Sequence, residues 1–90
     1  MIYHRPGFER RYKKLTPMQR SRVDAAVTRF AEKIGRPHEH SGIGVRGFGR
    51  YVEFRAGIDL RILALAESGD FFLMCVGNHN EVRAYLRHNP

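Results

Sequence analysis

Apolar residues in the second half of the chain are spaced as they are in β-strands. Val52 and Phe54 alternate with other residues and would share one face of an extended segment over 50–55. The opposite face of this segment carries Tyr51, Glu53 and Arg55. Two further apolar segments, 60–66 and 71–76, are joined to it and to each other by short turns that contain glycine. Three strands connected in this way predict an antiparallel meander.

The spacing in the first half of the chain is helical instead. A short helix is expected from three residues at i, i+4 and i+7, which are Phe8, Tyr12 and Leu15. A second helix should run from Pro17 to about Ile34, because Thr16 is a good N-cap and Gln19 completes a capping box. Its apolar stripe consists of Val23, Val27, Phe30 and Ile34. These two segments predict an N-terminal helical hairpin with one buried face.

The ends of the chain and its central connection supply the remaining elements. Residues 1–4 could add a short edge strand to the sheet. Asn78 and Glu81 form a capping box that should begin a short C-terminal helix. The Gly-rich connection 36–49 could hold one more short strand, around residues 43–45.

We therefore expect a single α+β domain that spans residues 1–90. The N-terminal helical hairpin would pack on a small antiparallel sheet, formed by the three-strand meander and the short N-terminal strand. All helices, including the short C-terminal one, would lie on one face of this sheet. Polar strand residues would gather on the other face, which would be concave or exposed.

The charge of the chain is strongly positive. Sixteen Lys and Arg residues oppose nine Asp and Glu residues, which gives a formal net charge of +7 at pH 7. Such an excess on a small domain points to an anionic partner, most often nucleic acid. Most of the basic residues are arginines, which suit phosphate geometry better than lysines. Solubility through net charge is the simpler alternative.

Cysteine content and hydropathy indicate the compartment. Cys75 is the single cysteine, so no internal disulfide can form, and we expect it to be a small buried hydrophobic residue. A reducing cytoplasm fits this pattern. Residues 1–6 hold no apolar signal core, and no apolar run approaches the length of a membrane span. We therefore expect a cytoplasmic protein with no membrane partner.

Arg61 is the first candidate for chemistry because it interrupts an apolar strand. It shares a strand face with Leu63 and Leu65, and a charge in apolar surroundings is costly unless it is paired. One interpretation is an ion pair with Glu53 across the hairpin, and the other is a clamp for a phosphate group. Arg55 lies close to Arg61 across the turn, and two facing arginines repel each other unless an anion lies between them.

His79 and Tyr85 follow the last strand. His79 stands where the strand ends and the C-terminal helix begins, so it could act as an acid or a base near neutral pH. Tyr85 could reach the same cleft, although simple packing of the helix would equally explain it. Arg46 and Arg50 lie at the mouth of the first meander strand, either as phosphate contacts or as a solvated rim.

Metal and nucleotide motifs are weak in this sequence. The sequence His38-Glu39-His40 lacks further convergent ligands, and the sole cysteine is distant. The Gly-rich segment 42–49 matches neither a P-loop nor a dinucleotide fingerprint. We expect no metal and no cofactor.

The order and spacing of these segments resemble the RelE/ParE superfamily of bacterial toxins from toxin–antitoxin systems. Residues 8–15 (FERRYKKL) resemble the first helix of the family. Residues 50–55 (RYVEFR) and 59–63 (DLRIL) resemble its paired central strands, and residues 76–82 (VGNHNEV) resemble the element before its last helix. The resemblance covers nearly the whole chain.

The resemblance implies one of two activities. RelE-type members are metal-independent ribonucleases that enter the ribosomal A site and cut mRNA, whereas ParE-type members share the fold and poison DNA gyrase. In the RelE type, basic residues on the central strands, an Arg or His after the third strand and a Tyr on the last helix act on the scissile phosphate. The matching positions here are Arg55, Arg61, His79 and Tyr85. A His after the third strand is similar to the YafQ-like branch.

The implied reaction uses the 2′-hydroxyl of RNA as the nucleophile. It yields a 2′,3′-cyclic phosphate and a 5′-hydroxyl, with the arginines stabilising the phosphate charge and His79 moving protons. RNA contacts are expected at Arg46, Arg50 and Tyr51, where a base could stack on the tyrosine. Glu53 departs from the family pattern, since RelE itself carries a lysine near this position. It could lower the phosphate-binding charge or provide a base.

Partners and alternatives follow from the same resemblance. A toxin of this kind implies mRNA and the ribosome as targets and a cognate antitoxin, expected to be acidic and partly disordered. A gyrase inhibitor without nuclease activity is the first alternative. A non-toxic basic domain that binds nucleic acid is the second.

Overall fold

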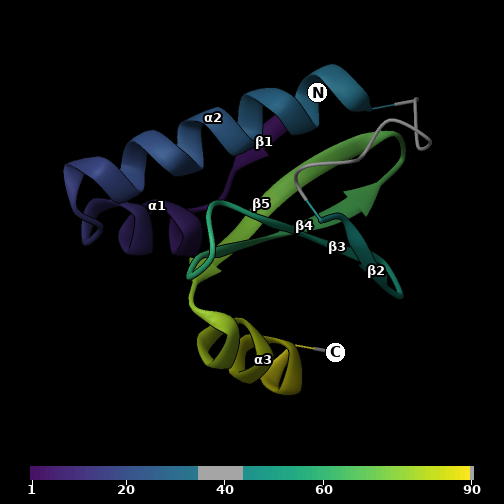
Figure 1. The fold of residues 1–90 in the computed structure, drawn as a ribbon. Helices are drawn as coiled ribbons and strands as arrows, with labels where there is room; N and C mark the ends of the chain where they lie inside the picture. The colour runs from purple at the N-terminus through teal and green to yellow at the C-terminus, as the bar shows by residue number, and fades with distance from the viewer. Residues whose placement is uncertain (35–43, 90) are drawn as a thin grey trace.

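The chain folds into one five-stranded sheet with helices on both of its faces. The computed structural model describes residues 1–34 and 44–89. In chain order, the elements are β1 (Ile2–His4), α1 (Pro6–Lys13), α2 (Pro17–Lys33), β2 (Arg46–Phe48), β3 (Tyr51–Arg55), β4 (Arg61–Glu67), β5 (Asp70–Gly77) and α3 (His79–His88) (Figure 1).

The sheet is mostly antiparallel. Its strand order is β1-β5-β4-β3-β2, in which β1 pairs in parallel with β5 and every other pair is antiparallel. The predicted meander of β3, β4 and β5 and the N-terminal edge strand are therefore confirmed. The expectation that the N-terminal strand would also be antiparallel was wrong, because no tight turn joins β1 to β5 and fixes its direction. The additional strand expected around residues 43–45 is found slightly later, as β2, and residue 43 lies outside the described residues.

The local signals in the sequence place the helix boundaries well. Thr16 accepts from the backbone N–H of Gln19, whose side chain accepts from the Thr16 N–H, so the predicted capping box begins α2. Helix α1 begins at Pro6, earlier than the apolar spacing indicated, because proline is well tolerated in the first turn of a helix. Within the described residues, no helix is long and apolar enough to cross a membrane.

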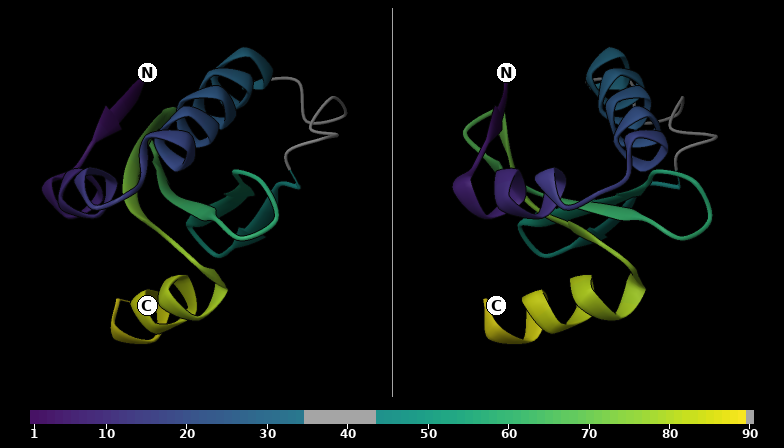
Figure 2. Two further views of the ribbon diagram at one scale, coloured as in Figure 1. Left: turned by 60° about the vertical axis from the view of Figure 1, so that its left-hand side comes forward. Right: turned by 90° about the vertical axis from the view of Figure 1, so that its left-hand side faces the viewer.

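The helices do not all lie on one face of the sheet. Helices α1 and α2 cover one face, and α3 crosses the opposite face (Figures 1 and 2). The expectation of a single helical layer was wrong because the central strands are apolar on both sides. In β4, Ile62 and Ala64 are buried toward α2, and Leu63 between them is buried toward α3.

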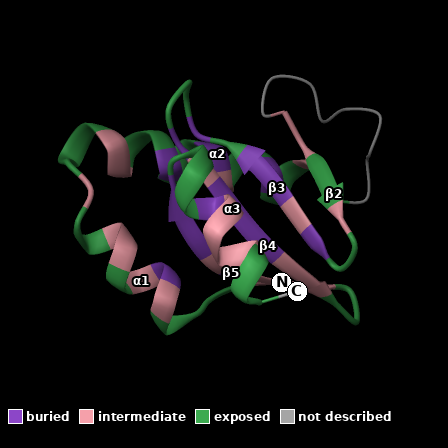
Figure 3. Cartoon of the chain, turned by 90° about the horizontal axis from the view of Figure 1, so that it is seen from below, coloured by how far each residue is buried: buried purple, intermediate pink, exposed green. Residues whose placement is uncertain are grey.

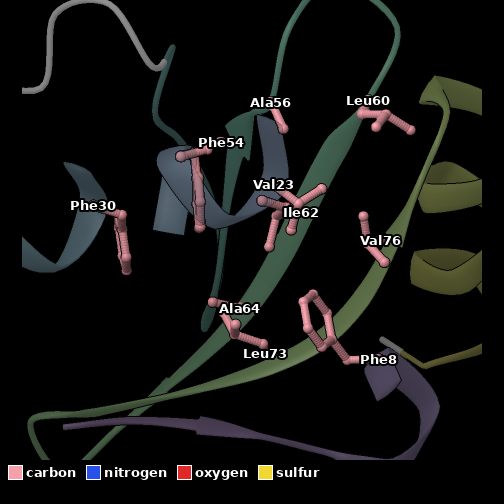
Figure 4. Close-up of a cluster of buried hydrophobic side chains, with 11 residues drawn as sticks. Phe8, Val23, Phe30, Phe54, Ala56, Leu60, Ile62, Ala64, Leu73 and Val76 are labelled. Carbon is pink, nitrogen blue, oxygen red and sulfur yellow. The ribbon is translucent and has the colours of Figure 1, made fainter. Parts of the chain in front are cut away.

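The larger core lies under α1 and α2. The rings of Phe30 and Phe54 stack in parallel with their centroids 4.4 Å apart. Phe8 from α1 joins this cluster together with Ile62 and Val76 from the sheet (Figure 4). All five side chains are at most 2% exposed, so this side of the sheet is a closed structural core.

A smaller core joins α3 to the opposite face. Val82 packs there with Tyr51, Leu63 and Cys75. A bulge in β5 shifts the register beyond Leu63, so that Met74 and Cys75 both contribute to this side. Figure 3 looks onto this face and shows the buried parts of the central strands behind α3. The expected polar face is therefore partly apolar and partly covered.

Candidate active site

Strand register brings the two predicted arginines together. Arg55 on β3 is the direct partner of Arg61 on β4, and Arg61 is in turn the partner of Gly77 on β5. His79, the first residue of α3, follows Gly77 by two positions. Because cross-strand partners share one face of a sheet, Arg55 and Arg61 project on the side that α3 covers, next to the start of this helix.

Glu53 is a completely buried carboxylate in this arrangement. It is 0% exposed and precedes Arg55 by two residues on the same face of β3. It therefore lies beside the facing residues Arg55 and Arg61, which we call the arginine pair. Its Oε1 accepts from Nη1 of Arg61 at 3.5 Å, and its Oε2 accepts from Nη1 of Arg83 at 3.1 Å. The ion pair between Glu53 and Arg61 is therefore present. A buried carboxylate is tolerated when cations saturate it, and here each oxygen has its own arginine.

Arg83 is a site residue that the sequence did not reveal. Besides its bond to Glu53, its guanidinium lies over the ring of Phe48, 4.5 Å from the ring centroid. In the sequence, Arg83 lies between the apolar residues Val82 and Leu86. The helical spacing of these residues does not show whether Arg83 faces the sheet or the solvent. The one signal was its position four residues after His79, which puts both side chains on the same face of α3.

Arg55 lies across the backbone of the segment that precedes β2. Its side chain is exposed, and a Cβ built on Gly44 would come within 2.9 Å of Arg55 Nε. Gly44 also has a φ of +58°, a conformation that glycine adopts without strain. The backbone therefore favours glycine at position 44, and a larger residue there would also displace the Arg55 side chain.

His79 is exposed at the first position of α3. The cap that precedes it is complete, because Asn78 accepts from the N–H of Glu81 and the Glu81 side chain accepts from the N–H of Asn78, both at 2.8 Å. No hydrogen bond or ion pair joins the His79 ring to any residue within 1–34 or 44–89. The imidazole is consequently available to a ligand at the start of α3.

Tyr85 lies on a different side of α3 from His79 and Arg83. Its ring meets the ring of Tyr51 edge to face, with the centroids 6.4 Å apart. Burial raises the pKa of the Tyr85 hydroxyl above its ordinary value, so this group stays protonated at neutral pH. None of the contacts in the described chain joins Tyr85 to Arg55 or Arg61. The structure thus pairs Arg55 with Arg61 and places His79 two residues beyond Gly77, the partner of Arg61, whereas Tyr85 lies further along α3.

The three residues predicted to bind RNA differ in accessibility. Arg46 and Arg50 are exposed at the β2–β3 end, and the Arg46 guanidinium lies 5.7 Å from the centroid of the Phe48 ring. Tyr51 is only 8% exposed, and its hydroxyl donates to the backbone oxygen of Asn89 at 2.8 Å. With α3 in this position, a base cannot stack on Tyr51, so that expectation is corrected.

A groove of about 880 Å³ runs along the flank on which Tyr85 lies, between α1 and the start of α3. Its α1 wall carries the cations Arg10, Arg11 and Lys14. Arg11 forms an ion pair with Glu81 at 3.2 Å and so links α1 to α3. The sequence showed a basic α1 but gave no indication that this helix faces α3 across the edge of β5.

Metal ligands do not converge in the described part of the chain. No group of three or more His, Cys, Asp or Glu side chains there could hold a metal ion. Residues 38–40, which carry the His-Glu-His sequence, lie outside the described residues.

Comparisons with known proteins give the fold. No protein-family model and no curated protein matches the sequence. The structure is similar to a chain in the crystal structure of the RelB–RelE antitoxin–toxin complex from Methanococcus jannaschii, with a TM-score of 0.67 and 14% sequence identity. The match covers 92% of this chain and 96% of that chain. At this identity the similarity establishes the fold alone, and it confirms the expected α+β fold class.

Proposed function

We propose that this chain is the toxin of a toxin–antitoxin pair and acts as a metal-independent endoribonuclease on mRNA at the ribosome. The observation that carries the proposal is the convergence of Arg61 and Arg83 on the buried Glu53, with the exposed His79 one helical turn before Arg83 on α3. The fold that it shares with a chain of the RelB–RelE antitoxin–toxin complex supports the biological setting. The positive net charge supports a polyanionic substrate.

The arginines would bind and neutralise the phosphate under attack. Arg55 is exposed and Arg61 is 19% exposed at its side chain, so both guanidinium groups are accessible from solvent. Charge-assisted hydrogen bonds from two guanidinium groups would stabilise the additional negative charge of the pentavalent phosphate. Glu53 holds Arg61 and Arg83 in place through its two ion pairs. Its complete burial argues against a role as the base that contacts the 2′-hydroxyl.

His79 would carry the proton transfer. In the reaction, the 2′-hydroxyl loses its proton as its oxygen attacks the adjacent phosphorus, and the 5′-oxygen of the next nucleotide leaves and gains a proton. An imidazole can perform either transfer near neutral pH. We assign this role to His79 because it is exposed at the start of α3, two residues beyond the β5 partner of Arg61. Tyr85 is assigned a packing role, since it lies on the other flank of α3.

The partners belong to the same proposal. Toxins of this type act in the cytoplasm and need a protein that neutralises them, and the RelB–RelE complex contains an antitoxin bound to its toxin. The basic surface of this chain favours an antitoxin with an acidic binding segment. The ribosome would hold the mRNA in the geometry that in-line attack requires.

A reconstituted translation reaction tests the proposal. We expect the purified wild-type protein to stop protein synthesis and to cut the mRNA, and we expect Arg61→Ala and His79→Ala to do neither while remaining folded by circular dichroism. Tyr85→Phe should slow cleavage less than about tenfold, because we assign Tyr85 a packing role against Tyr51. Arg29→Ala removes an exposed charge on α2, on the other side of the sheet, and should behave as wild type.

A DNA gyrase supercoiling assay tests the alternative function, inhibition of gyrase. Inhibition of gyrase by the wild-type protein, without cleavage of mRNA, would replace the ribonuclease assignment with that of a gyrase inhibitor. Full activity of both Arg61→Ala and His79→Ala in the translation reaction would refute the assigned site.

A further inference from the structure

A second hollow lies on the α3 side of the sheet, away from the arginine pair. Its volume is about 270 Å³, and it is lined by Arg5, Leu65, Glu67, Phe72 and Met74. Arg5 directly follows β1, and the other four residues belong to β4 and β5. The hollow thus lies at the part of the sheet where β1, β5 and β4 are side by side.

The apolar surface of the hollow includes one aromatic ring. Phe72 and Leu65 are direct partners across β4 and β5. Tyr3, which does not line the hollow, stacks on Phe72 with the two centroids 5.2 Å apart and the rings inclined by 20°. Because Phe72 lines the hollow and Tyr3 does not, the aromatic surface offered there to a flat ligand is that of Phe72.

The rim of the hollow carries one cation and one anion that do not neutralise each other. The side chains of Arg5 and Glu67 form no ion pair or hydrogen bond with any described residue. Most other acidic side chains in the described chain are paired. Those with a partner are Glu9, Asp24, Glu53, Asp59, Asp70 and Glu81. A free donor and a free acceptor therefore flank one aromatic surface.

We propose that this hollow binds one unpaired nucleobase, with guanine preferred. The base would stack on Phe72, as single-stranded bases do on aromatic side chains. The Glu67 carboxylate would accept two parallel N–H bonds from N1 and N2 of guanine, and Arg5 would donate to O6 or N7. Guanine is the base that offers two adjacent N–H donors beside such acceptors. The inference rests on the proposed function, in which the substrate is single-stranded RNA.

The hollow and the arginine pair lie on the same face of the sheet. Leu65 follows Arg61 by four residues on β4 and projects from the same face of the sheet. At the rise of a β-strand, this separation is about 13 Å. Leu63 between these two residues is buried under α3, so an RNA strand that reaches both places would pass around this helix.

Titration of the ¹⁵N-labelled protein with the four nucleoside 5′-monophosphates tests the inference by NMR. We expect GMP to shift the amide resonances around Glu67 and Phe72 and to bind about tenfold more tightly than CMP or UMP. Phe72→Leu should weaken every nucleotide roughly tenfold, because the stacking surface is lost. Glu67→Gln should abolish the preference for guanine, because a carboxamide presents one acceptor and a competing donor.

Controls separate this inference from the proposed ribonuclease activity. Glu32→Gln makes the same charge change at an exposed position on α2 and should leave GMP binding unchanged. Equal binding of all four nucleotides, shifts confined to other surfaces, or binding that Glu67→Gln leaves unaltered would overturn the inference. None of these readouts requires RNA cleavage. A protein that cuts mRNA without this base preference would therefore refute the subsite alone, and a GMP-binding protein that cuts no mRNA would refute the catalytic assignment alone.

Discussion

The Glu53 carboxylate shows how one buried residue can organise a charged surface. It has no exposed area, yet its two oxygens face Arg61 and Arg83 from different elements. Each guanidinium is partly exposed and retains donors for another anion. The sequence indicated the pair with Arg61, because strand alternation placed both side chains on one face. Arg83 was not predictable, since its contact depends on where α3 docks.

Replacing Glu53 with Gln tests this arrangement through stability. Removing the buried charge leaves Arg61 and Arg83 without their common partner, and we expect the free energy of unfolding to fall by about 2 kcal/mol. Urea denaturation measures the change. In a double-mutant cycle with Arg83→Gln, the two losses should be less than additive, because both variants break the same contact. Strict additivity would contradict the coupling.

The Cys75 thiol should be unreactive in the folded protein. Its side chain is 0% exposed, and burial raises the pKa of its thiol above the ordinary value. We expect no reaction with a disulfide reagent such as DTNB at pH 8 until urea unfolds the chain. The pKa of the Cys75 thiol is higher in the folded chain than in the unfolded chain. The neutral thiol therefore contributes fully to stability at pH values below the pKa of the unfolded chain. This contribution is lost as the pH rises through the pKa that the thiol has in the folded chain. Rapid labelling of the native protein would contradict this burial.

Helix α3 is the element whose position most affects the candidate site. Its start was predictable from the Asn78–Glu81 capping box, and both hydrogen bonds of that box are present. The face on which it packs was not predictable from local spacing. Both faces of β4 and β5 are apolar, so either side could accept the apolar stripe of the helix. The long-range contact between Arg11 and Glu81 is equally invisible in the sequence pattern.

Gly77→Ala tests the junction between β5 and α3. A Cβ at this position would lie 2.8 Å from Oε1 and 3.0 Å from Cβ of Glu81, the residue that completes the helix cap. Displacing Glu81 should lower the free energy of unfolding by about 1 kcal/mol through loss of the cap. Thermal unfolding followed by circular dichroism measures the change.

Gly47→Ala is the matched control for this substitution. A Cβ on Gly47 would meet no atom within 4 Å, and the residue is exposed on β2. We expect its effect to stay within about 0.5 kcal/mol. If Gly47→Ala and Gly77→Ala destabilise the protein equally, the close approach of Glu81 is not what constrains the junction.

At the scale of the whole molecule, one sheet separates a structural core from a charged, partly covered face. Period-2 alternation, helix caps and glycine turns were sufficient to predict the α+β class, the order of the three meander strands and the N-terminal helical hairpin. They also placed Arg55 opposite Arg61 on neighbouring strands and His79 just beyond the end of the last strand. They could not place Tyr51 under α3 or Tyr85 on its far flank, because both positions follow from docking between distant segments.

The central claim is that this face cuts RNA by attack of the 2′-hydroxyl. The most direct test induces the protein in growing cells and maps 5′-hydroxyl RNA ends within minutes, for the wild-type protein and His79→Ala at equal expression. We predict new 5′-hydroxyl ends inside translated reading frames with the wild-type protein, and none with the variant. Growth arrest without such ends, or identical ends in His79→Ala, would contradict the account.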